Sequence, residues 1–490
     1  MHETTTKETT KRETQPVMGS QDQTGSSALP LMKVDHLACS TFTKNQREWL
    51  DQMFQLQTRQ QIGKLMTKIW GGVPIYMPDP QAGSYNLAHR MQFDSGQDAV
   101  LRQVNRGTSM FPDEKTTAEV NVMRLVAEKT AIPVAFVQCA KLTGDAKEKG
   151  AEDLDTPDLR PFILMEYLPH DRDMGKALNT PGFPDEEPQV LNPKLDPAEL
   201  KRLYRLAANA LLDLSRLEFD AIGSPELMDD GSSKVTSRPL TRRMNELVAM
   251  GGCRRDDLPQ TVFTSAHEYL VTLAQLHMDH LAYQQNDAWS DELDCRQKYV
   301  ARLLFRNMVS ARERCDADRG PFTLWCDDFR PTNILLRGDD LAGVVDWEFA
   351  YAAPAAFARA PPWWLLLQRP EEWRAGWVDW KRAYETALAV FLAAMTDAED
   401  AAIAAGRLAE RHRLSRQMLQ SWENGDFWVV YALQMDYDFD YVFWNGIFTR
   451  HYGPCKDFDA VWEKAWSVLT HEERREALRF ASDKVSGLGG

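Results

Sequence analysis

Residues 325–349 read Trp-Cys-Asp-Asp-Phe-Arg-Pro-Thr-Asn-Ile-Leu-Leu-Arg-Gly-Asp-Asp-Leu-Ala-Gly-Val-Val-Asp-Trp-Glu-Phe, and this stretch decides the fold. Two apolar runs around a turn at 337–340 predict a β-hairpin. Asn333 lies four residues before the turn and Asp346 six residues after it, so we expect them to lie roughly opposite each other at its open end. Oxygen ligands held side by side on paired strands suit a hard cation such as Mg²⁺. Asp328 lies just upstream, in a loop stiffened by Pro331.

These three polar residues form a pattern that suits phosphoryl transfer. In that reaction metal ions bridge the phosphates, and a carboxylate accepts the proton of the substrate hydroxyl. The alternative is an acidic surface hairpin, because Asp and Asn are common turn residues. The apolar strands and the Val-Val-Asp-Trp-Glu ending at Glu348 favour the catalytic interpretation.

Asp-x-x-x-x-Asn followed by an apolar strand, a turn and Asp-Trp-Glu resembles the catalytic core of the aminoglycoside phosphotransferase-like kinase family, most of all its fungal members of unassigned substrate. The resemblance implies that Asp328 is the catalytic base, Asn333 a metal ligand and Asp346 the counterpart of the metal-binding Asp in the protein-kinase Asp-Phe-Gly. It implies ATP as donor, Mg²⁺ as cofactor and a small-molecule hydroxyl as acceptor. The family usually has His-Gly-Asp where this chain has Cys326-Asp327-Asp328, which puts local rigidity in doubt.

Glu348 and Arg330 are further candidate site residues in the motif, and each has two interpretations. Glu348 could support the metal or face solvent along its strand. Arg330 could neutralise the charge of the transferred phosphate, or it could be a structural partner of Asp327. We expect Asp327 to be the more solvent-facing of the two adjacent acids, because the spacing to Asn333 selects Asp328.

The upstream part of the chain is expected to bind the nucleotide. Gly83 and Ser84 precede a predicted hairpin at 85–104, where backbone N–H groups and the Ser84 hydroxyl could contact phosphates, although an ordinary turn fits equally well. Arg102 lies where the kinase pattern Val-Ala-Ile-Lys carries its Lys. Glu166 ends a predicted buried strand at the start of a hinge at 165–171, and it is a further candidate for nucleotide binding.

Glu119 supports the assignment of Arg102. It lies on the inward face of a predicted helix at 114–129, three, four and seven residues before apolar positions. A buried carboxylate needs a cation, and the kinase pattern predicts that this cation is Arg102. The alternative is chance placement of a solvated strand arginine.

The order of elements predicts an α+β, bilobal, protein-kinase-like fold, with a small strand-rich N-lobe and a large, mainly helical C-lobe. We expect a disordered tail at 1–35, an N-lobe with a leading helix at 36–168 and the C-lobe at 169–490. Helices are predicted at 44–70, 114–129, 197–218, 238–250, 262–284, 292–313, 378–395, 397–412, 415–435 and 457–483, and strands at 85–93, 100–104, 134–140 and 162–167.

The composition narrows the class of protein. With 57 Lys and Arg against 72 Asp and Glu, the net charge of −15 argues against binding to nucleic acid or to anionic membranes. Seven scattered cysteines fit reduced thiols better than a disulfide framework or a zinc site. The acidic N-terminal residues lack the apolar region of a signal peptide. We therefore expect a cytoplasmic protein with no membrane span.

The acceptor is the least determined part. There is no Ala-Pro-Glu after the motif, which disfavours a protein substrate and favours a small molecule. Asp436 and Asp440, near Phe443 and Trp444, could hold a cationic acceptor if they share a helix face. The alternative is a core helix with acids on its solvated side. A catalytically impaired pseudokinase that binds nucleotide or acts as a scaffold, and a nucleotide hydrolase without an acceptor, are the other candidate functions.

Overall fold

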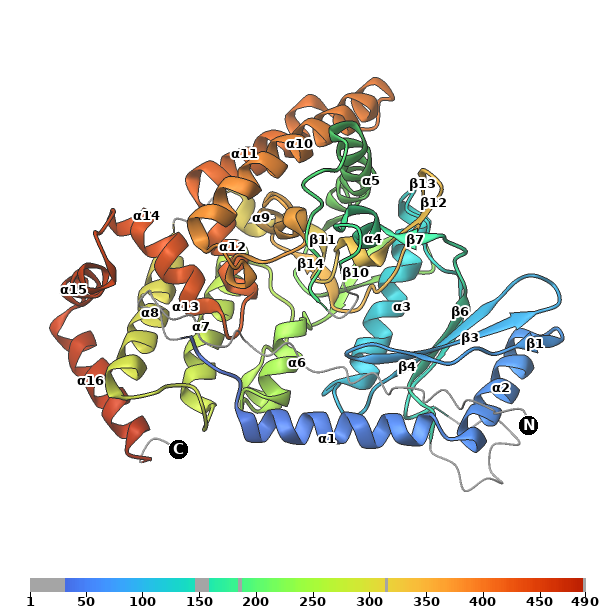
Figure 1. The fold of residues 1–490 in the computed structure, drawn as a ribbon, viewed down its shortest axis with the longest axis horizontal. Coiled ribbons are helices and arrows are strands. Elements are labelled where there is room, and N and C mark those ends of the chain that lie inside the picture. The colour runs from blue at the N-terminus through green and yellow to red at the C-terminus, as the bar shows by residue number, and fades with distance from the viewer. Residues whose placement is uncertain (1–30, 146–157, 184–186, 313–315, 488–490) are drawn as a thin grey trace, which may run out of the picture.

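The computed structural model describes residues 31–145, 158–183, 187–312 and 316–487, so most of the predicted tail lies outside the described residues. At residues 31–35 the chain is already packed: Met32 is buried, and Asp35 caps the first helix, α1 (His36–Met53). The two-lobed α+β architecture is confirmed. Figure 1 shows the strand-rich N-lobe on the right and the helical C-lobe on the left.

The N-lobe is built on an antiparallel six-stranded sheet. Its path runs β1 (Pro74–Tyr76), β3 (Asn86–Phe93), β4 (Ala99–Val104), β6 (Phe162–Glu166) and β5 (Val137–Lys141), and the short β2 (Gln81–Ala82) also pairs with β3. Alternation along β4 sends Leu101 to one face, where it packs in a cluster with Ile62 and Met66 of α2 (Leu56–Trp70). The other face is covered by α3 (Pro112–Lys129), which buries Val122 and Val126.

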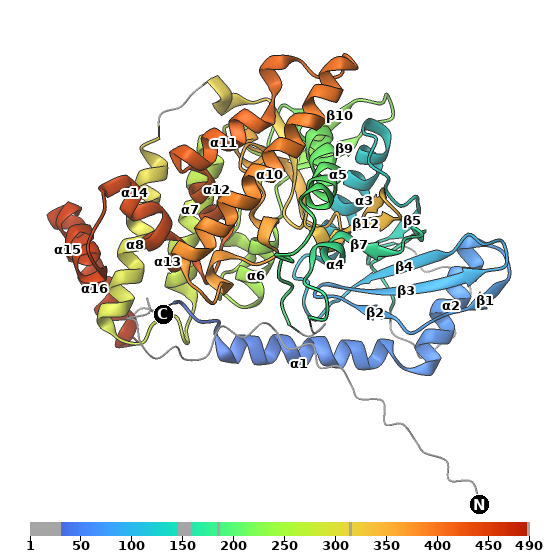
Figure 2. The same ribbon diagram turned by 45° about the horizontal axis from the view of Figure 1, so that its top comes forward.

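Two helices tie the lobes together. Figures 1 and 2 both show α1 running along one side of the molecule from the C-lobe to the N-lobe. It passes so close to the turn after β4 that a Cβ on Gly107 would lie 2.6 Å from the backbone of Asn45, so only glycine fits there. On the C-lobe side, Asn245 of α6 (Arg242–Ala249) accepts a hydrogen bond from Met110 N and donates one to Thr108 O.

The C-lobe contains the motif hairpin and most of the helices. The hairpin is β12 (Ile334–Arg337) and β13 (Asp340–Val344), joined by β7 (Arg172–Asp173), which directly follows the hinge. A second sheet orders β14 (Ala350–Ala353), β11 (Phe322–Cys326) and β8 (Glu218–Phe219). Close packing of the hinge on the hairpin requires a small residue, because a Cβ on Gly343 would approach Leu168 within 2.5 Å.

Helices surround these sheets. They are α4 (Met174–Leu178), α5 (Pro197–Ser215), α6, α7 (Ala266–Tyr283), α8 (Glu292–Ser310), α9 (Ala355–Ala358), α10 (Trp377–Ala404), α11 (Leu414–Asn424), α12 (Asp426–Gln434), α13 (Phe439–Val442), α14 (Thr449–Tyr452), α15 (Phe458–Val468) and α16 (His471–Val485), with a π-helix at Phe443–Phe448. α5 packs on α10, and α8 packs on both α7 and α16. One continuous apolar core joins these helices to α3.

Several predicted helix boundaries are wrong, each for a local reason. The predicted helix at 44–70 is two helices, α1 and α2. The predicted helix at 378–395 extends to Ala404 as α10 and takes in the first half of the predicted helix at 397–412, and α10 ends just before Gly406, whose φ is +68°. The predicted helix at 415–435 breaks at Gly425, whose φ of +89° ends α11. The predicted helix at 457–483 breaks at Thr470, which forms a capping box with Glu473. The segment at 220–236, which separates two of the predicted helices, contains the hairpin β9 (Ser224–Leu227) and β10 (Ser233–Ser237).

Within the described residues, no helix is long and apolar enough to cross a membrane. Among the described residues, free thiols are present at Cys39, Cys253, Cys295, Cys326 and Cys455.

Candidate active site

The motif hairpin forms as predicted, with a shift of one residue in its register. Ile334 pairs with Val344, and Val345 N donates to Asn333 O over 3.0 Å, so Asn333 lies opposite Val345 and not opposite Asp346. Regular pairing from Arg337 opposite Asp340 would place Val344 opposite Asn333, and the irregularity between Leu335 and Leu336 adds one residue to β13 and moves the partner to Val345, one residue short of Asp346. Asp346 follows immediately and still lies at the open end of the hairpin.

Asp328 is held by two partners from its own loop. Asn333 Nδ2 donates to Asp328 Oδ2 over 2.8 Å and to its carbonyl oxygen over 2.9 Å. Arg330 Nε lies 2.9 Å from Oδ1, so Arg330 pairs with Asp328, and the alternative pairing with Asp327 is wrong. Burial raises the pKa of Asp328, assisted by the carboxylates of Asp346 and Glu348, while Arg330 opposes the rise.

Asp346 has a strained backbone and an accessible carboxylate. Its φ of +60° is uncommon for a residue with a side chain, and such strain often occurs at functional sites. The side chain is 37% exposed, and one oxygen, Oδ1, lies 2.5 Å from Arg102. Asn333 directs its NH₂ group to Asp328, and its side-chain oxygen, Oδ1, has no protein donor among the described residues. One carboxylate and one amide oxygen at the mouth of the hairpin fit a hard divalent cation.

The predicted pair of Arg102 and Glu119 is confirmed as a contact. Arg102 Nη1 lies 2.9 Å from Glu119 Oε1, and both side chains are almost completely buried. The same guanidinium also contacts Asp346 and, at 3.3 Å, Glu348. Burial alone would lower the pKa of Arg102, but Asp346, Glu119 and Glu348 together raise it. Arg102 therefore stays charged and joins the α3 helix to the motif hairpin.

Lys115 is a member of this cluster that the sequence interpretation missed. It lies one helical turn before Glu119, is buried, and places Nζ 2.5 Å from Glu348 Oε2. Asn86 bridges the two groups by donating to Glu348 over 2.7 Å and accepting from Lys115 over 2.8 Å. The spacing of four residues between two inward-facing charges was the signal that could have revealed Lys115.

These contacts decide between the two interpretations of Glu348 as far as its exposure to solvent is concerned. Its side chain is buried, so the solvent-facing alternative is wrong. Burial by itself would raise the pKa of Glu348, but the adjacent Lys115 and Arg102 more than offset it and lower the pKa to about 2. Glu348 is therefore an anion paired with two buried cations, and its role as a metal ligand stays a prediction.

The predicted nucleotide loop is the turn between β2 and β3. Gly83 N donates to Asn86 O over 2.8 Å, and Gly83 and Ser84 are exposed. The next residue, Tyr85, crosses to the C-lobe and donates to Glu246 over 2.6 Å. The turn is thus anchored on both sides, and Thr108 Oγ1 also donates to Ser84 O over 2.9 Å. Contact between Gly83, Ser84 and phosphate stays a prediction.

Glu166 ends β6 at the hinge. Its side chain accepts from Phe136 N over 2.8 Å, and its own N–H donates to Phe136 O. The Glu166 carboxylate therefore fastens the edge of the sheet in this structure. Its contact with a nucleotide stays a prediction.

Cys326 and Asp327 occupy the positions of the family's His and Gly. Cys326 Sγ is buried and lies 3.8 Å from the carbonyl oxygen of Asp346, and burial raises the pKa of the thiol well above its usual range. The thiol therefore packs against the backbone beneath Asp346. Asp327 and Asp328 are both half-buried, so the expectation that Asp327 is the more solvent-facing of the two stays a prediction. Asp327 accepts from Trp325 Nε1 over 2.8 Å and lies against Arg242.

Asp327 supplies a test of these electrostatics. Burial raises the pKa of Asp327 to about 6, against about 3.9 in an unfolded chain. Deprotonation of Asp327 therefore destabilises the folded state as the pH rises from about 4 to above 6. We expect Asp327→Asn to gain about 2–3 kcal/mol in free energy of unfolding, relative to wild type, between pH 4 and pH 7.5. Urea denaturation at both pH values measures this difference. Asp339→Asn, at an exposed turn, is the control, and a difference that does not change with pH would contradict the prediction.

Asp436 and Asp440 do not lie where the sequence interpretation put them. Asp436 precedes α13 in a bend, and Arg243 Nε donates to it over 3.1 Å. Asp440 accepts from Arg302 over 2.8 Å. All four side chains are buried, so the acids neither line an acceptor pocket as free anions nor lie on a solvated helix face. The argument for a cationic acceptor loses its basis.

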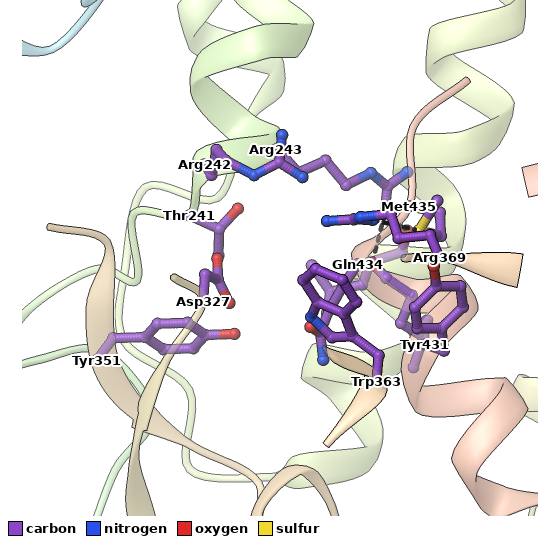
Figure 3. Close-up of a pocket in the computed structure, with 12 residues that line it drawn as sticks. Thr241, Arg242, Arg243, Asp327, Tyr351, Trp363, Arg369, Tyr431, Gln434 and Met435 are labelled. Atoms are coloured by element: carbon purple, nitrogen blue, oxygen red, sulfur yellow. Dashed lines mark hydrogen bonds between the residues drawn. The ribbon is translucent and has the colours of Figure 1, made fainter. Parts of the chain in front are cut away.

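A pocket lies next to the loop that contains Asp328, and most of its lining residues are not among the predicted site residues. It encloses about 500 Å³, including its opening to solvent. Figure 3 shows Asp327 and Tyr351 on one side, with Trp363 and Tyr431 across from them. The lining comes from α6, α7, β14, α12 and the segment around 363–369. Because Asp327 immediately precedes Asp328, this pocket adjoins the proposed base.

The fold and the comparisons define the class. The two-lobed α+β fold is of the kinase-like kind. Residues 81–391, more than half of the chain, match the phosphotransferase enzyme family, so the chain belongs to that family. The candidate site residues from Gly83 to Glu348 lie inside the matched range.

Individual relatives are distant. Clavilactone A biosynthesis cluster protein Y of Ampulloclitocybe clavipes is 22% identical over 292 residues, which cover 57% of this chain and 62% of that protein. An aminoglycoside phosphotransferase structure in its apo form has 13% identity and a TM-score of 0.40, covering 78% of this chain and 99% of that one. A Plasmodium vivax ethanolamine kinase has 9% identity and a TM-score of 0.38, covering 82% of this chain and 84% of that one.

Proposed function

We propose that this protein transfers the γ-phosphate of ATP, with Mg²⁺, to a hydroxyl group of a small molecule. The observation that carries the proposal is the meeting of Asp328, Asn333 and Asp346 at one end of the hairpin with the buried pair of Arg102 and Glu119. Both lobes contribute to this arrangement, because Arg102 and Glu119 come from the N-lobe and the hairpin residues from the C-lobe.

Each residue then has a definite task. Asp328 accepts the proton as the acceptor oxygen bonds to the γ-phosphorus, and the bond from that phosphorus to the bridging oxygen of ADP breaks. Arg102 meets the α- and β-phosphates, and Glu119 holds its position. Arg330, which is 46% exposed beside Asp328, neutralises charge on the group in transfer. The turn at Gly83 and Ser84 covers the phosphates.

Asn333 and Asp346 would hold the metal ion, which supplies electrostatic stabilisation of the phosphate oxygens when bound. We expect Asp346→Asn to weaken Mg²⁺-dependent ATP binding by at least about tenfold, since a neutral amide is a poorer ligand for a hard cation. Calorimetric ATP titrations at several Mg²⁺ concentrations measure the effect. Asp339→Asn, which is 87% exposed at the hairpin turn, serves as the matched control. Unchanged binding with unchanged metal dependence would remove Asp346 from the site.

A nucleotide-binding pseudokinase is the second candidate. The observation that favours it is the ion pair between Arg102 and Asp346, which engages one carboxylate oxygen that a metal ion would otherwise use. The retention of Asp328, Asn333 and Asp346 together argues against it, because binding alone does not need a base.

One experiment separates these functions. The purified protein is incubated with ATP and Mg²⁺ and a pooled library of hydroxyl compounds, and products are identified by the mass of an added phosphoryl group. Phosphorylated product supports the kinase. ATP binding without any product supports the pseudokinase, and release of phosphate without an acceptor product supports a hydrolase.

A further inference from the structure

The pocket beside the catalytic loop has an excess of cationic side chains. Of its twelve lining residues three are arginines, Arg242, Arg243 and Arg369, and Asp327 is the single carboxylate. Arg242 and Arg243 begin α6, so the positive end of a helix dipole adds to their charge. Figure 3 shows these two arginines on one side of the pocket, with Arg369 near Met435.

The least satisfied of these groups is the Arg243 guanidinium. Its Nε and Nη1 donate to Asp436, Leu273 O and Leu433 O, at 2.8–3.1 Å. Nη2 is buried and has no hydrogen-bond partner among the described residues. A buried, unpartnered donor on a charged group is costly unless a ligand satisfies it. An anionic oxygen is the partner that a guanidinium binds most strongly.

Two neighbouring acids oppose the positive charge. Glu246 pairs with Arg242 over 2.6 Å, and Asp436 accepts from Arg243. Asp436 also faces Glu246; burial and that carboxylate raise the pKa of Asp436 well above its usual range, which favours its neutral form.

Two carboxylates, those of Glu371 and Asp438, also lie near the guanidinium of Arg369. Glu371 lies 3.8 Å away, but burial raises its pKa to about 8, and Tyr431 donates to it over 2.9 Å. Glu371 is therefore mostly neutral at pH 7. Asp438 also faces Arg369 and opposes its charge, although burial raises the pKa of Asp438. The Arg369 guanidinium also stacks 4.4 Å from the Trp363 ring, which holds it in a fixed plane.

An apolar cavity adjoins this basic pocket. The two share Asp327, Trp363, Tyr431 and Gln434, and the second is lined by apolar side chains such as Phe329, Leu214, Met418 and Val430. One ligand could therefore extend from the arginines over the aromatic rings into apolar surroundings, passing Asp327 and the adjacent Asp328.

We propose that the acceptor is an anionic hydroxy compound, with a carboxylate or phosphate bound by Arg243, Arg242 and Arg369 and an aromatic or apolar body against Trp363 and Tyr431. This inference names the substrate class of the proposed phosphotransferase and rests on that function. It reverses the cationic acceptor expected from Asp436 and Asp440.

The test uses four probes with one ring and one primary alcohol. They are 4-(hydroxymethyl)benzoate, 4-(hydroxymethyl)phenyl phosphate, the neutral methyl ester of the first, and the cationic 4-(aminomethyl)benzyl alcohol. Binding to the full-length protein is measured by calorimetry without ATP, and phosphorylation is then followed by mass with Mg²⁺-ATP. We expect one or both anions to bind at least about tenfold more tightly than the ester, and the amine to bind weakest.

Variants locate the binding site. Arg369→Gln is expected to reduce anion affinity about tenfold and to leave ester affinity unchanged, since it lies at the partly exposed side of the pocket. The matched control is Arg416→Gln, 80% exposed on α11, which should change neither. Arg243→Lys keeps one charge in the buried position, and a melting curve establishes that it folds.

The outcomes separate this inference from the proposed function. Equal or tighter binding of the amine, no measurable anion binding by folded protein, or an anion affinity unchanged in Arg369→Gln overturns the inference. If only neutral or cationic alcohols are phosphorylated, the phosphotransferase stands and the anionic acceptor is overturned. If the anions bind at Arg369 and no alcohol is phosphorylated, the anion site stands and the phosphotransferase fails.

Discussion

Asp328→Asn is expected to leave ATP affinity near wild type and to lower turnover by about 10²–10⁴-fold. In the proposed mechanism Asp328 meets the acceptor proton, while Arg102 and Asp346 meet the nucleotide, so the loss should fall on the chemical step alone. Asparagine preserves the shape of the side chain and can still accept from Asn333 Nδ2, which holds Asp328 over 2.8 Å. It cannot accept a proton at neutral pH.

The measurements are kcat with a saturating acceptor and Kd for ATP by calorimetry. A matched control is Asp339→Asn in the same hairpin, where the side chain is exposed and far from the mouth of the hairpin. Turnover equal to that of wild type would show that Asp328 is not the base. A parallel loss of ATP affinity would show that it contacts the nucleotide or the metal.

Lys115→Met is expected to lower the free energy of unfolding by roughly 3–5 kcal/mol, because it leaves a buried carboxylate without its main partner. Lys115 lies 2.5 Å from Glu348 and 3.9 Å from Glu119, and all three side chains are buried. Asn86 would lose its donor as well. Urea denaturation of the purified variant measures the change.

The double variant Lys115→Met with Glu348→Gln should recover part of this loss, since the uncompensated charge is gone. A double-mutant cycle should give a coupling energy of about 0.5–3 kcal/mol. Lys44→Met, which removes a 72% exposed lysine on α1, is the control and should change stability by less than about 0.5 kcal/mol. Additive single effects would mean that Lys115 and Glu348 do not stabilise each other.

Local sequence signals predicted the parts of the site that are close in the chain. The hairpin and the loop of Asp328 both lie within residues 325–349, so turn chemistry and strand alternation are enough to specify them. The pair of Arg102 and Glu119 was predicted across 17 residues, because a carboxylate on an apolar helix face requires a cation. The exact register of the hairpin was not predictable, since an irregularity between Leu335 and Leu336 decides that Asn333 lies opposite Val345.

Residues that meet across large distances in the chain were decided by the tertiary structure. By itself, the sequence determined the class of fold, the motif and the identity of the base and metal candidates, because each is encoded in a local pattern. It did not determine that Asp436 and Asp440 are bound by Arg243 and Arg302, about 140–190 residues away. A charged side chain has the same sequence signal in water and in the core, and only packing decides which carboxylates are neutralised and which arginines stay free for a ligand.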